Sequence, residues 1–254
     1  MSTKNELKYY ASLHRKKYRD DEKKFIVEGT KIIDEGLVSN FNCEIIFVTF
    51  QFNEENRKYL YELKKKGLTI EVLKSPEFKK ISDTVTPQGI AAIFTKPSNK
   101  HTFISNQGSN IIVCLDNISD PGNIGTILRN CDWFGINNIL MLNNSADAFS
   151  SKAIRASMGS IFHLNIKTEP DAKRSLSDIK IKGYKIICAD LKGKNIFQYQ
   201  PDIKTAIIFS NEANGPSIDV LSLVDDSVTI PKLGTAESLN VASASAVILG
   251  QLTR

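Results

Sequence analysis

Short apolar runs alternate with amphipathic stretches along the first hundred residues of the chain. β-Branched and aromatic residues predict strands at 25–29, 44–50, 68–73 and 89–94. Helices are predicted between them at 29–38, 53–66 and 76–82, with Asn53 as the N-cap of the second helix and Gly67 just after its end. Strands that alternate with helices in this way predict a small α/β unit.

The second part of the chain carries apolar runs that predict a parallel sheet. Strands are predicted at 110–116, 137–142, 162–168, 184–190, 205–210 and 227–231, and helical stretches separate most of them. Continuous apolar runs such as IIVCL, at 111–115, are typical of strands that are buried on both faces. We therefore expect helices to cover both faces of this sheet.

A polar segment separates the two patterns. Residues 95–110 read TKPSNKHTFISNQGSN, which contains the turn and linker residues Pro, Gly, Ser and Asn. We predict a first domain over 1–96, a linker over 97–109 and a second domain over 110–254.

Three predicted strands of the second domain end in unusual turns, and ligands collect at the carboxyl ends of strands in open α/β sheets. The first turn, DPGNIGTILRN at 120–130, contains Gly122 and Gly125, which let the backbone approach a ligand closely. Arg129 lies one helical turn beyond Gly125, and its side chain is expected to lean back toward the turn. This turn matches neither the dinucleotide pattern G-x-G-x-x-G nor a P-loop.

The second turn, NEANG at 211–215, follows the predicted strand 205–210 directly. A carboxylate just beyond a buried strand belongs either to a binding site or to the cap of the next helix. Glu212 is therefore a candidate site residue.

The third turn begins after Pro231 and leads to Ser238 and Asn240 at the start of a helix. The first turns of this helix, 242–246, contain only Ala and Ser. Such small residues permit close helix approach, either within one chain or across a tight dimer interface.

The positive charge is concentrated in the first part of the chain. The net charge is +5, and residues 1–100 account for it with 19 Lys and Arg against 14 Asp and Glu. The segment 4–25 combines basic residues with Tyr9, Tyr10 and His14, a composition that suits phosphate contacts and base stacking. It is either a solvated amphipathic helix or an RNA-binding segment, whose candidate contacts are Arg15, Lys16, Lys17 and Arg19.

Composition narrows the class further. A hydrophobic fraction of 41% and a charged fraction of 24% are typical of a soluble globular protein, and no apolar run is long enough to span a bilayer. The polar N-terminus has no signal core, so we expect a cytoplasmic protein without a membrane partner. The four cysteines and three histidines form no C-x-x-C or H-x-x-x-H pattern, so no metal is expected, and Cys114 and Cys188 should be buried.

Together the three turns resemble the three signature motifs of the SpoU/TrmH family in the SPOUT superfamily. The first motif, N-x-G-x-x-x-R, matches at Asn123, Gly125 and Arg129, and the second, N-E-x-x-G, matches at 211–215. The third, I-P followed by S-L-N, matches at 230–231 and 238–240. All three occur in the family's order, with Ser210 and Ala213 at positions where the family often has glycine.

The first domain also resembles part of this family. Residues 25–37 and 81–94 are similar to the N-terminal RNA-substrate-binding domain of many members, which has a ribosomal-protein-like α/β fold. For the second domain the resemblance implies a parallel-sheet α/β fold with a deep trefoil knot in its C-terminal part. Members are dimers with the active site near the interface, so a homodimer is expected.

The resemblance implies an S-adenosylmethionine-dependent RNA ribose 2′-O-methyltransferase. Its substrate would be ribosomal RNA first, transfer RNA second, and not DNA. The residues that it implies for cofactor binding are Ser210, Glu212, Gly215, Ile230, Pro231 and Leu239. Those that it implies for catalysis are Arg129, Asn123, Glu212, Ser238 and Asn240, of which Asn123 and Arg129 also contact RNA.

Two roles stay open for Arg129. A free guanidinium is a poor base, so Arg129 is either a base that an RNA phosphate makes competent or a clamp that orients that phosphate. The alternative functions are an RNA-binding protein with a dead catalytic domain, which the intact motifs argue against, and a nucleotide-dependent oxidoreductase, which the absent G-x-G-x-x-G pattern argues against.

Overall fold

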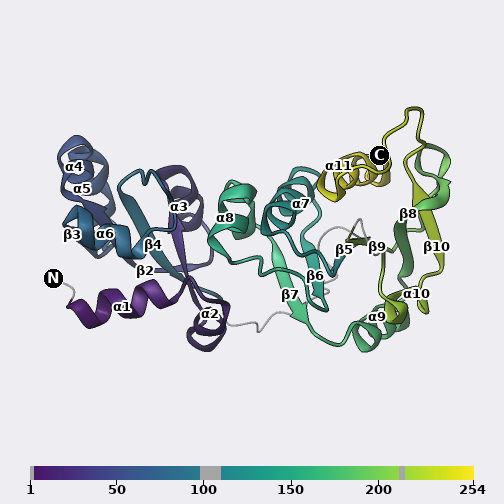
Figure 1. Cartoon of the computed structure of the whole chain (residues 1–254), viewed down its shortest axis with the longest axis horizontal. Coiled ribbons are helices and arrows are strands. Elements are labelled where there is room, and N and C mark those ends of the chain that lie inside the picture. Colours follow the sequence, from purple (N-terminus) through teal and green to yellow (C-terminus); the bar gives the residue numbers. More distant parts are fainter. Residues whose placement is uncertain (1–2, 98–109, 212–214) are drawn as a thin grey trace. The chain divides into compact units, whose positions relative to one another are not determined.

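The computed structural model describes residues 3–97, 110–211 and 215–254. The chain forms two compact units (Figure 1). The first contains residues 1–99 and 149–162, and the second contains residues 100–148 and 163–254. The division therefore does not follow the order of the chain, because a short later segment belongs to the first unit.

The first unit is built on a four-stranded mixed sheet. Its strands β1 (Lys24–Glu28), β2 (Asn42–Thr49), β3 (Ile70–Leu73) and β4 (Ile90–Thr95) lie in the order β1-β4-β2-β3. Strand β4 is antiparallel to both of its neighbours, and β3 is parallel to β2. The helices of this unit are α1 (Lys4–Ser12), α2 (Lys16–Glu22), α3 (Thr30–Leu37), α4 (Phe50–Glu55), α5 (Arg57–Lys65), α6 (Ser75–Ile81) and α8 (Ser151–Ser157), followed by the 3₁₀ turn η1 (Ser160–Phe162).

A cluster of phenylalanines holds the later segment, 149–162, in the first unit. The ring of Phe149 lies 4.9 Å from that of Phe25 in β1, and the ring of Phe162 lies 5.1 Å from that of Phe94 in β4. Gly36 in α3 makes room for these rings, since a Cβ atom there would lie 2.6 Å from Phe94 and 2.7 Å from Phe162. Such edge and tilted aromatic contacts stabilise a core beyond the area that they bury.

The predicted domain boundaries differ from these units in one place. The prediction assigned all of 110–254 to the second domain, but residues 149–162 complete the aromatic core of the first unit. No local pattern in the sequence shows this, because the aromatic partners Phe25 and Phe94 lie far earlier in the chain. Nearly all of the predicted linker, 97–109, lies outside the described residues.

The second unit is a six-stranded parallel sheet with helices on both faces, as predicted (Figure 1). Its strand order is β10-β8-β9-β5-β6-β7. The strands are β5 (Ile111–Asp116), β6 (Asn138–Leu142), β7 (Asn165–Glu169), β8 (Lys185–Asn195), β9 (Thr205–Ser210) and β10 (Asp226–Thr229). The helices are α7 (Pro121–Trp133), α9 (Ala172–Ile181), α10 (Ile218–Leu221) and α11 (Val241–Leu252), with the 3₁₀ turn η2 (Ile196–Gln198).

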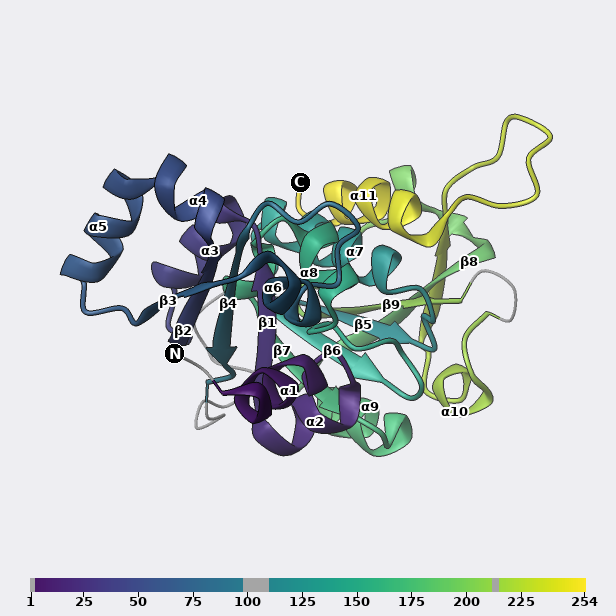
Figure 2. The ribbon, with the colours of Figure 1, turned by 60° about the vertical axis from the view of Figure 1, so that its left-hand side comes forward.

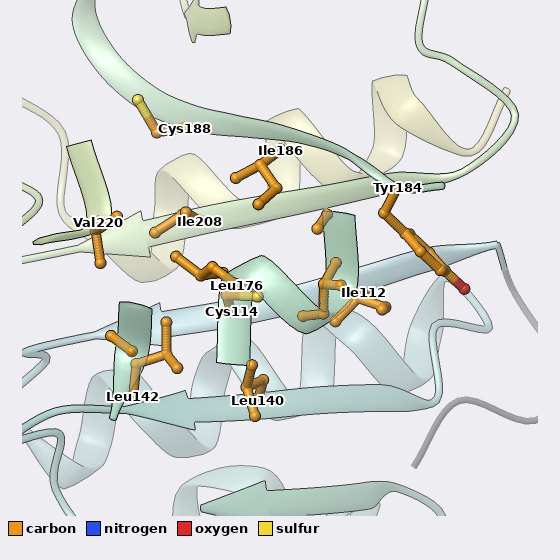
Figure 3. Close-up of a cluster of buried hydrophobic side chains, with 13 residues drawn as sticks. Ile112, Cys114, Leu140, Leu142, Leu176, Tyr184, Ile186, Cys188, Ile208 and Val220 are labelled. Carbon is orange, nitrogen blue, oxygen red and sulfur yellow. The ribbon is translucent and has the colours of Figure 1, made fainter. Parts of the chain in front are cut away.

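One hydrophobic core of the second unit lies between the sheet and helices α9 and α10. Leu176 of α9 and Val220 of α10 are fully buried with Cys114 of β5 and Ile208 of β9 (Figure 3). Cys114 and Cys188 are buried as predicted, and all four cysteines are free thiols. The continuous apolar runs of the central strands thus belong to strands that are covered on both faces.

The predicted strands all exist, within a few residues at their ends, but one predicted helix is wrong. The stretch 53–66 forms two helices, α4 and α5, and they meet at Asn56. Thr49 rather than Asn53 is the N-cap of α4, since its hydroxyl accepts a hydrogen bond from the Phe52 amide at 3.2 Å. Gly67 follows the end of α5 with a positive φ of +80°, as predicted.

A long loop connects β10 to α11 in the second unit, and Figure 2 shows it in yellow-green. Its residues 231–240 are all exposed. None of the described helices is long and apolar enough to cross a membrane. The deep knot implied by the family resemblance stays a prediction.

Candidate active site

A cavity of about 490 Å³ lies beside the carboxyl-terminal parts of β8, β9 and β10. This volume is within the range of sites for small organic molecules. Residues of the loop 230–239 and three residues of α11, Val241, Ala244 and Ile248, also line it, as do Asn211, Gly215 and Pro216. The cavity therefore lies where ligands collect in open α/β sheets.

Most of the predicted cofactor-binding residues lie in this cavity. Residues of the second and third turns meet there, although they are separated in the sequence. The predicted residues that line the cavity are Ser210, Gly215, Ile230, Pro231, Ser238 and Leu239. Glu212 and Ala213 lie outside the described residues.

The first turn becomes the start of α7. Asp120 is the N-cap, and its carboxylate accepts a hydrogen bond from the Gly122 amide at 2.9 Å. Pro121 occupies the first helical position, where its missing N–H costs nothing. Asn123 and Arg129 follow on this helix, and Arg129 is exposed.

A hydrogen bond joins the first turn to the third. The side-chain amide of Asn240 donates to the Asn123 side-chain oxygen at 3.0 Å. The oxygen of Asn240 also caps α11, because it accepts from the Ala242 amide at 3.0 Å. One asparagine therefore fixes both the start of α11 and a predicted catalytic residue on α7.

Arg129 does not line the cavity. Within the described parts of the chain, its side chain makes no hydrogen bond or ion pair. The structure thus brings Asn123 and Asn240 together, joins them to the cavity through the first residues of α11, and leaves Arg129 on the exposed side of α7.

Sequence reasoning missed several residues around the cavity. Asp190 and Lys192, in the second half of β8, line it, and the predicted strand ended at Asp190. Asn130 on α7 donates to the Ala242 carbonyl oxygen at 3.0 Å and to the Ser245 hydroxyl at 2.9 Å, which ties α7 to α11. Asp190 and Lys192 could have been found, because they lie at the carboxyl end of a predicted strand, where ligands collect. No motif in the sequence indicated Asn130.

The Ala/Ser run of α11 packs at least partly within one chain. Ala242 and Ser245 are buried and face the Asn130 contacts on α7. Ala244 lines the cavity, and Ala246 is half-buried. Of the two explanations left open for this run, close packing inside the unit therefore accounts for Ala242 and Ser245.

Two titratable side chains of β8 and β10 have shifted pKa values. Burial raises the pKa of the Cys188 thiol, so it stays protonated near neutral pH. A hydrogen bond from Lys194 lowers the pKa of Asp226, so this carboxylate stays charged. In the described ranges no cluster of three or more His, Cys, Asp or Glu side chains could hold a metal ion.

Not all of the candidate RNA-contacting side chains of the first unit are exposed in the structure. Arg15, Lys16 and Lys17 are exposed at the start of α2, where they can reach a phosphate. The predicted RNA contact of Arg19 is corrected by the structure. Its side chain is only 4% exposed and donates to the carbonyl oxygens of Leu13 and His14 at 2.8 and 2.7 Å. Its guanidinium stabilises the α1–α2 connection instead of binding RNA.

The aromatic residues of this segment also have structural roles. Tyr10 packs edge-on against Phe47 at 5.1 Å, and burial raises its pKa to about 12. His14 contacts the Ile81 carbonyl oxygen at 3.0 Å, and Tyr9 donates to Glu22 at 2.8 Å. Tyr9, Tyr10 and His14 therefore contribute to the fold of the first unit, and they are poorer candidates for base stacking than their sequence pattern indicates.

Two family models match the chain. The SpoU rRNA Methylase family matches residues 110–250, and the MRM3-like substrate binding domain matches residues 4–92. The two matches cover nearly all of both sheets and leave out residues 93–109.

Characterised relatives and solved structures are similar over nearly the whole chain. The 23S rRNA (guanosine(2553)-2'-O)-methyltransferase RlmP of Bacillus subtilis is 31% identical, over 99% of this chain and 97% of that protein. Human mitochondrial rRNA methyltransferase 3 is 26% identical, over 91% of this chain and 68% of that protein. A putative RNA methyltransferase of the TrmH family from Porphyromonas gingivalis has a TM-score of 0.83 at 30% identity, with 99% and 98% of the two chains covered.

One further structure shares the fold. The SpoU methyltransferase AviRb of Streptomyces viridochromogenes, solved with the cofactor AdoMet, has a TM-score of 0.88 at 23% identity. It covers 99% of this chain and 97% of that chain. The similarity extends over both units and includes the parallel sheet that carries the cavity.

Proposed function

Because this chain belongs to the SpoU rRNA methylase family, we propose that it methylates a ribose 2′-hydroxyl of ribosomal RNA with S-adenosylmethionine as the methyl donor. The observation that carries the proposal is the convergence of the three turns. Residues of the second and third turns line one cavity, and the Asn123–Asn240 hydrogen bond joins the first turn to them.

The cavity suits S-adenosylmethionine in size and chemistry. Its volume of about 490 Å³ is that of a site for one small organic molecule. Apolar side chains would contact the adenine, and backbone groups of the loops would hold its polar edges. The residues proposed for this are Ser210, Gly215, Ile230, Pro231 and Leu239, which line the cavity, together with Glu212 of the second motif. When bound, this cofactor supplies an electrophilic methyl group.

The chain's own residues would orient the ribose and take up its proton. Transfer to a hydroxyl needs alignment of the nucleophile and removal of its proton. We assign the alignment to Asn123 and Asn240, which are hydrogen-bonded to each other, and to Ser238 at the cavity wall. Arg129 on α7 either takes up the proton as the base or orients an RNA phosphate as the clamp, and the family motif places Glu212 in the same catalytic set.

The first unit supplies the electrostatic surface for RNA. With the segment 149–162 included, this unit holds 20 Lys and Arg against 14 Asp and Glu, while the second unit holds 13 against 14. Phosphate contacts by basic residues release counterions and dominate RNA affinity. We therefore propose that the first unit is the RNA-substrate-binding domain, with Arg15, Lys16 and Lys17 among its contacts.

Replacing Arg15, Lys16 and Lys17 together by alanine should weaken RNA binding in a salt-dependent way. If each contacts one phosphate, the slope of log affinity against log salt should fall by about 2. Filter binding or fluorescence anisotropy across a salt series measures this. The matched control removes three exposed charges elsewhere in the unit, with Lys64, Lys65 and Lys66 changed to alanine. An equal loss in both variants would show that the α2 site has no special role.

We further propose a cytoplasmic homodimer that acts on RNA and not on DNA. The exposed apolar side chains of the second unit, such as Trp133 on α7 at 82% and Val247 on α11 at 38%, are consistent with a partner surface on these helices. Light scattering of the purified protein measures the assembly state directly.

Mapping 2′-O-methyl sites in cells with and without this gene tests the proposed reaction. We expect one ribosomal RNA position to lose its methyl group without the gene, and the purified protein to restore it in the presence of S-adenosylmethionine. A lost site in transfer RNA would change the substrate and keep the reaction. No lost site, together with RNA binding in vitro, would favour an RNA-binding protein without activity.

A further inference from the structure

The turn that follows β6, residues 143–146, is hydrogen-bonded to the loop of the first motif. The Ser145 hydroxyl donates to the Leu115 carbonyl oxygen at 3.0 Å and accepts from the Ile118 amide at 3.2 Å. The Ala146 amide donates to the Ile118 carbonyl oxygen at 2.8 Å. These bonds fix the path of the chain as it leaves β5 toward α7.

The same turn is also hydrogen-bonded to Ser217, two residues beyond the second motif. Asp116 is fully buried, and one of its carboxylate oxygens accepts a hydrogen bond from the Ser217 backbone amide at 2.8 Å. Its other oxygen accepts a hydrogen bond from the side-chain amide of Asn143. The Asn143 amide also reaches the Ser217 hydroxyl at 3.2 Å. We call these three residues, Asp116, Asn143 and Ser217, the clasp.

The clasp lies beside the cavity. Asp116 is the last residue of β5, and it pairs in register with Ser210 at the end of β9. The loop that begins after Ser210 ends at Ser217, and Gly215 and Pro216 just before the clasp line the cavity. Ser210 is therefore held by the sheet, and Ser217, which directly follows Pro216, is held by the clasp.

The backbone at Asn143 fits this role. Its φ of +44° lies in the left-handed region, which asparagine adopts more readily than most residues. That conformation ends β6 sharply, and the side-chain amide just beyond it donates to Asp116. Asp116 and Asn143 do not belong to the three signature motifs, so the sequence analysis assigned no role to them.

We propose that Asp116 and Asn143 are positioning residues for the cofactor, which hold Gly215 and Pro216 in place against the cavity. This inference rests on the proposed function, because it assigns the cavity to S-adenosylmethionine. The two residues act through the loop and do not line the cavity themselves. The affinity for the cofactor should therefore depend on the donor and acceptor arrangement of the clasp.

Asn143→Asp tests the arrangement, because it removes the donor and places two carboxylates face to face. We expect S-adenosylmethionine to bind about ten-fold more weakly, measured by calorimetry on the full-length protein. A double variant that combines Asn143→Asp with Asp116→Asn exchanges donor and acceptor. The amide introduced at position 116 can donate to the carboxylate introduced at position 143, while its oxygen still accepts from the Ser217 amide. Affinity should therefore return to within about three-fold of the wild type.

The matched control is Asn144→Asp, which adds the same charge at the exposed neighbouring residue. Its cofactor affinity should equal that of the wild type. In steady-state assays Asn143→Asp should raise KM for S-adenosylmethionine and leave kcat at saturation within a few-fold. A general loss of folding would lower kcat as well, and the exchanged pair would not rescue it.

Unchanged affinity in Asn143→Asp, an equal loss in Asn144→Asp, or no rescue in the double variant would each overturn the inference. These outcomes leave the proposed function intact as long as the wild-type protein binds S-adenosylmethionine. A wild-type protein that does not bind it would overturn the proposed cofactor and the role of the clasp together.

Discussion

Arg129→Ala should lower methyl transfer by about 100- to 10,000-fold, the range that a general base or its equivalent contributes. We expect this loss of activity because Arg129 lies on α7, six residues after Asn123, and Asn123 is hydrogen-bonded to Asn240 of the third motif. Arg129 is exposed and does not line the cavity, so the fold and the affinity for S-adenosylmethionine should be unchanged. Single-turnover methylation and calorimetry measure the two quantities separately.

Two further variants sharpen this test. Arg129→Lys keeps a positive charge that can contact a phosphate but loses the planar fork. Partial recovery of activity in Arg129→Lys would support the clamp, and no recovery would support a role that only the guanidinium fills. Arg174→Ala, on the exposed face of α9, is the control for removal of an arginine and should keep full activity. Near wild-type turnover in Arg129→Ala would contradict the assignment.

Ala244→Leu should strongly weaken cofactor binding while the protein keeps its assembly state. Ala244 lines the cavity, so three extra carbon atoms would occupy space that the proposed cofactor needs. Overpacking of this kind costs about 1–3 kcal/mol, which weakens binding by about 5- to 150-fold. Calorimetry with S-adenosylmethionine and light scattering on the same sample measure the affinity and the mass.

Ala246→Leu is the matched variant two residues along α11. Ala246 is half-buried and does not line the cavity. If the remaining face of α11 forms a homodimer interface, this variant should become monomeric, with cofactor affinity reduced less than in Ala244→Leu. Loss of the dimer in Ala244→Leu with normal cofactor affinity would reverse the two assignments.

The sheets of both units could be predicted from the sequence because their strands are short apolar runs with turn residues between them. The runs at 111–115 and 206–209 form central strands, as their composition indicates. The extension of β8 to Asn195 could not be predicted. It depends on Gly193, where a Cβ atom would lie 2.5 Å from the Val228 backbone of β10. The close approach of β8 to β10 at Gly193, which the sequence alone does not show, lets the polar end of β8 remain in the sheet.

The candidate site was predicted where it depends on motifs and missed where it depends on contacts between distant turns. The cavity contains Ser210, Gly215 and Leu239 because their motifs follow strands whose carboxyl ends share one edge of the sheet. Arg19 was assigned to RNA because its charge is visible in the sequence and its burial is not. Asn143 donates to a residue 27 positions away, and no local pattern records that partner.

The segment 149–162 also determines when the first unit can fold during synthesis. Its sheet is complete once β4 ends at Thr95, but Phe149 and Phe162 belong to the aromatic core that covers β1 and β4. Until the ribosome has released residue 162, the rings of Phe25 and Phe94 lack these partners and stay accessible to chaperones or to other chains. A fragment that stops near residue 97 would keep this defect permanently. The order of translation therefore delays completion of the first unit until β5 and β6 of the second unit have already been synthesised.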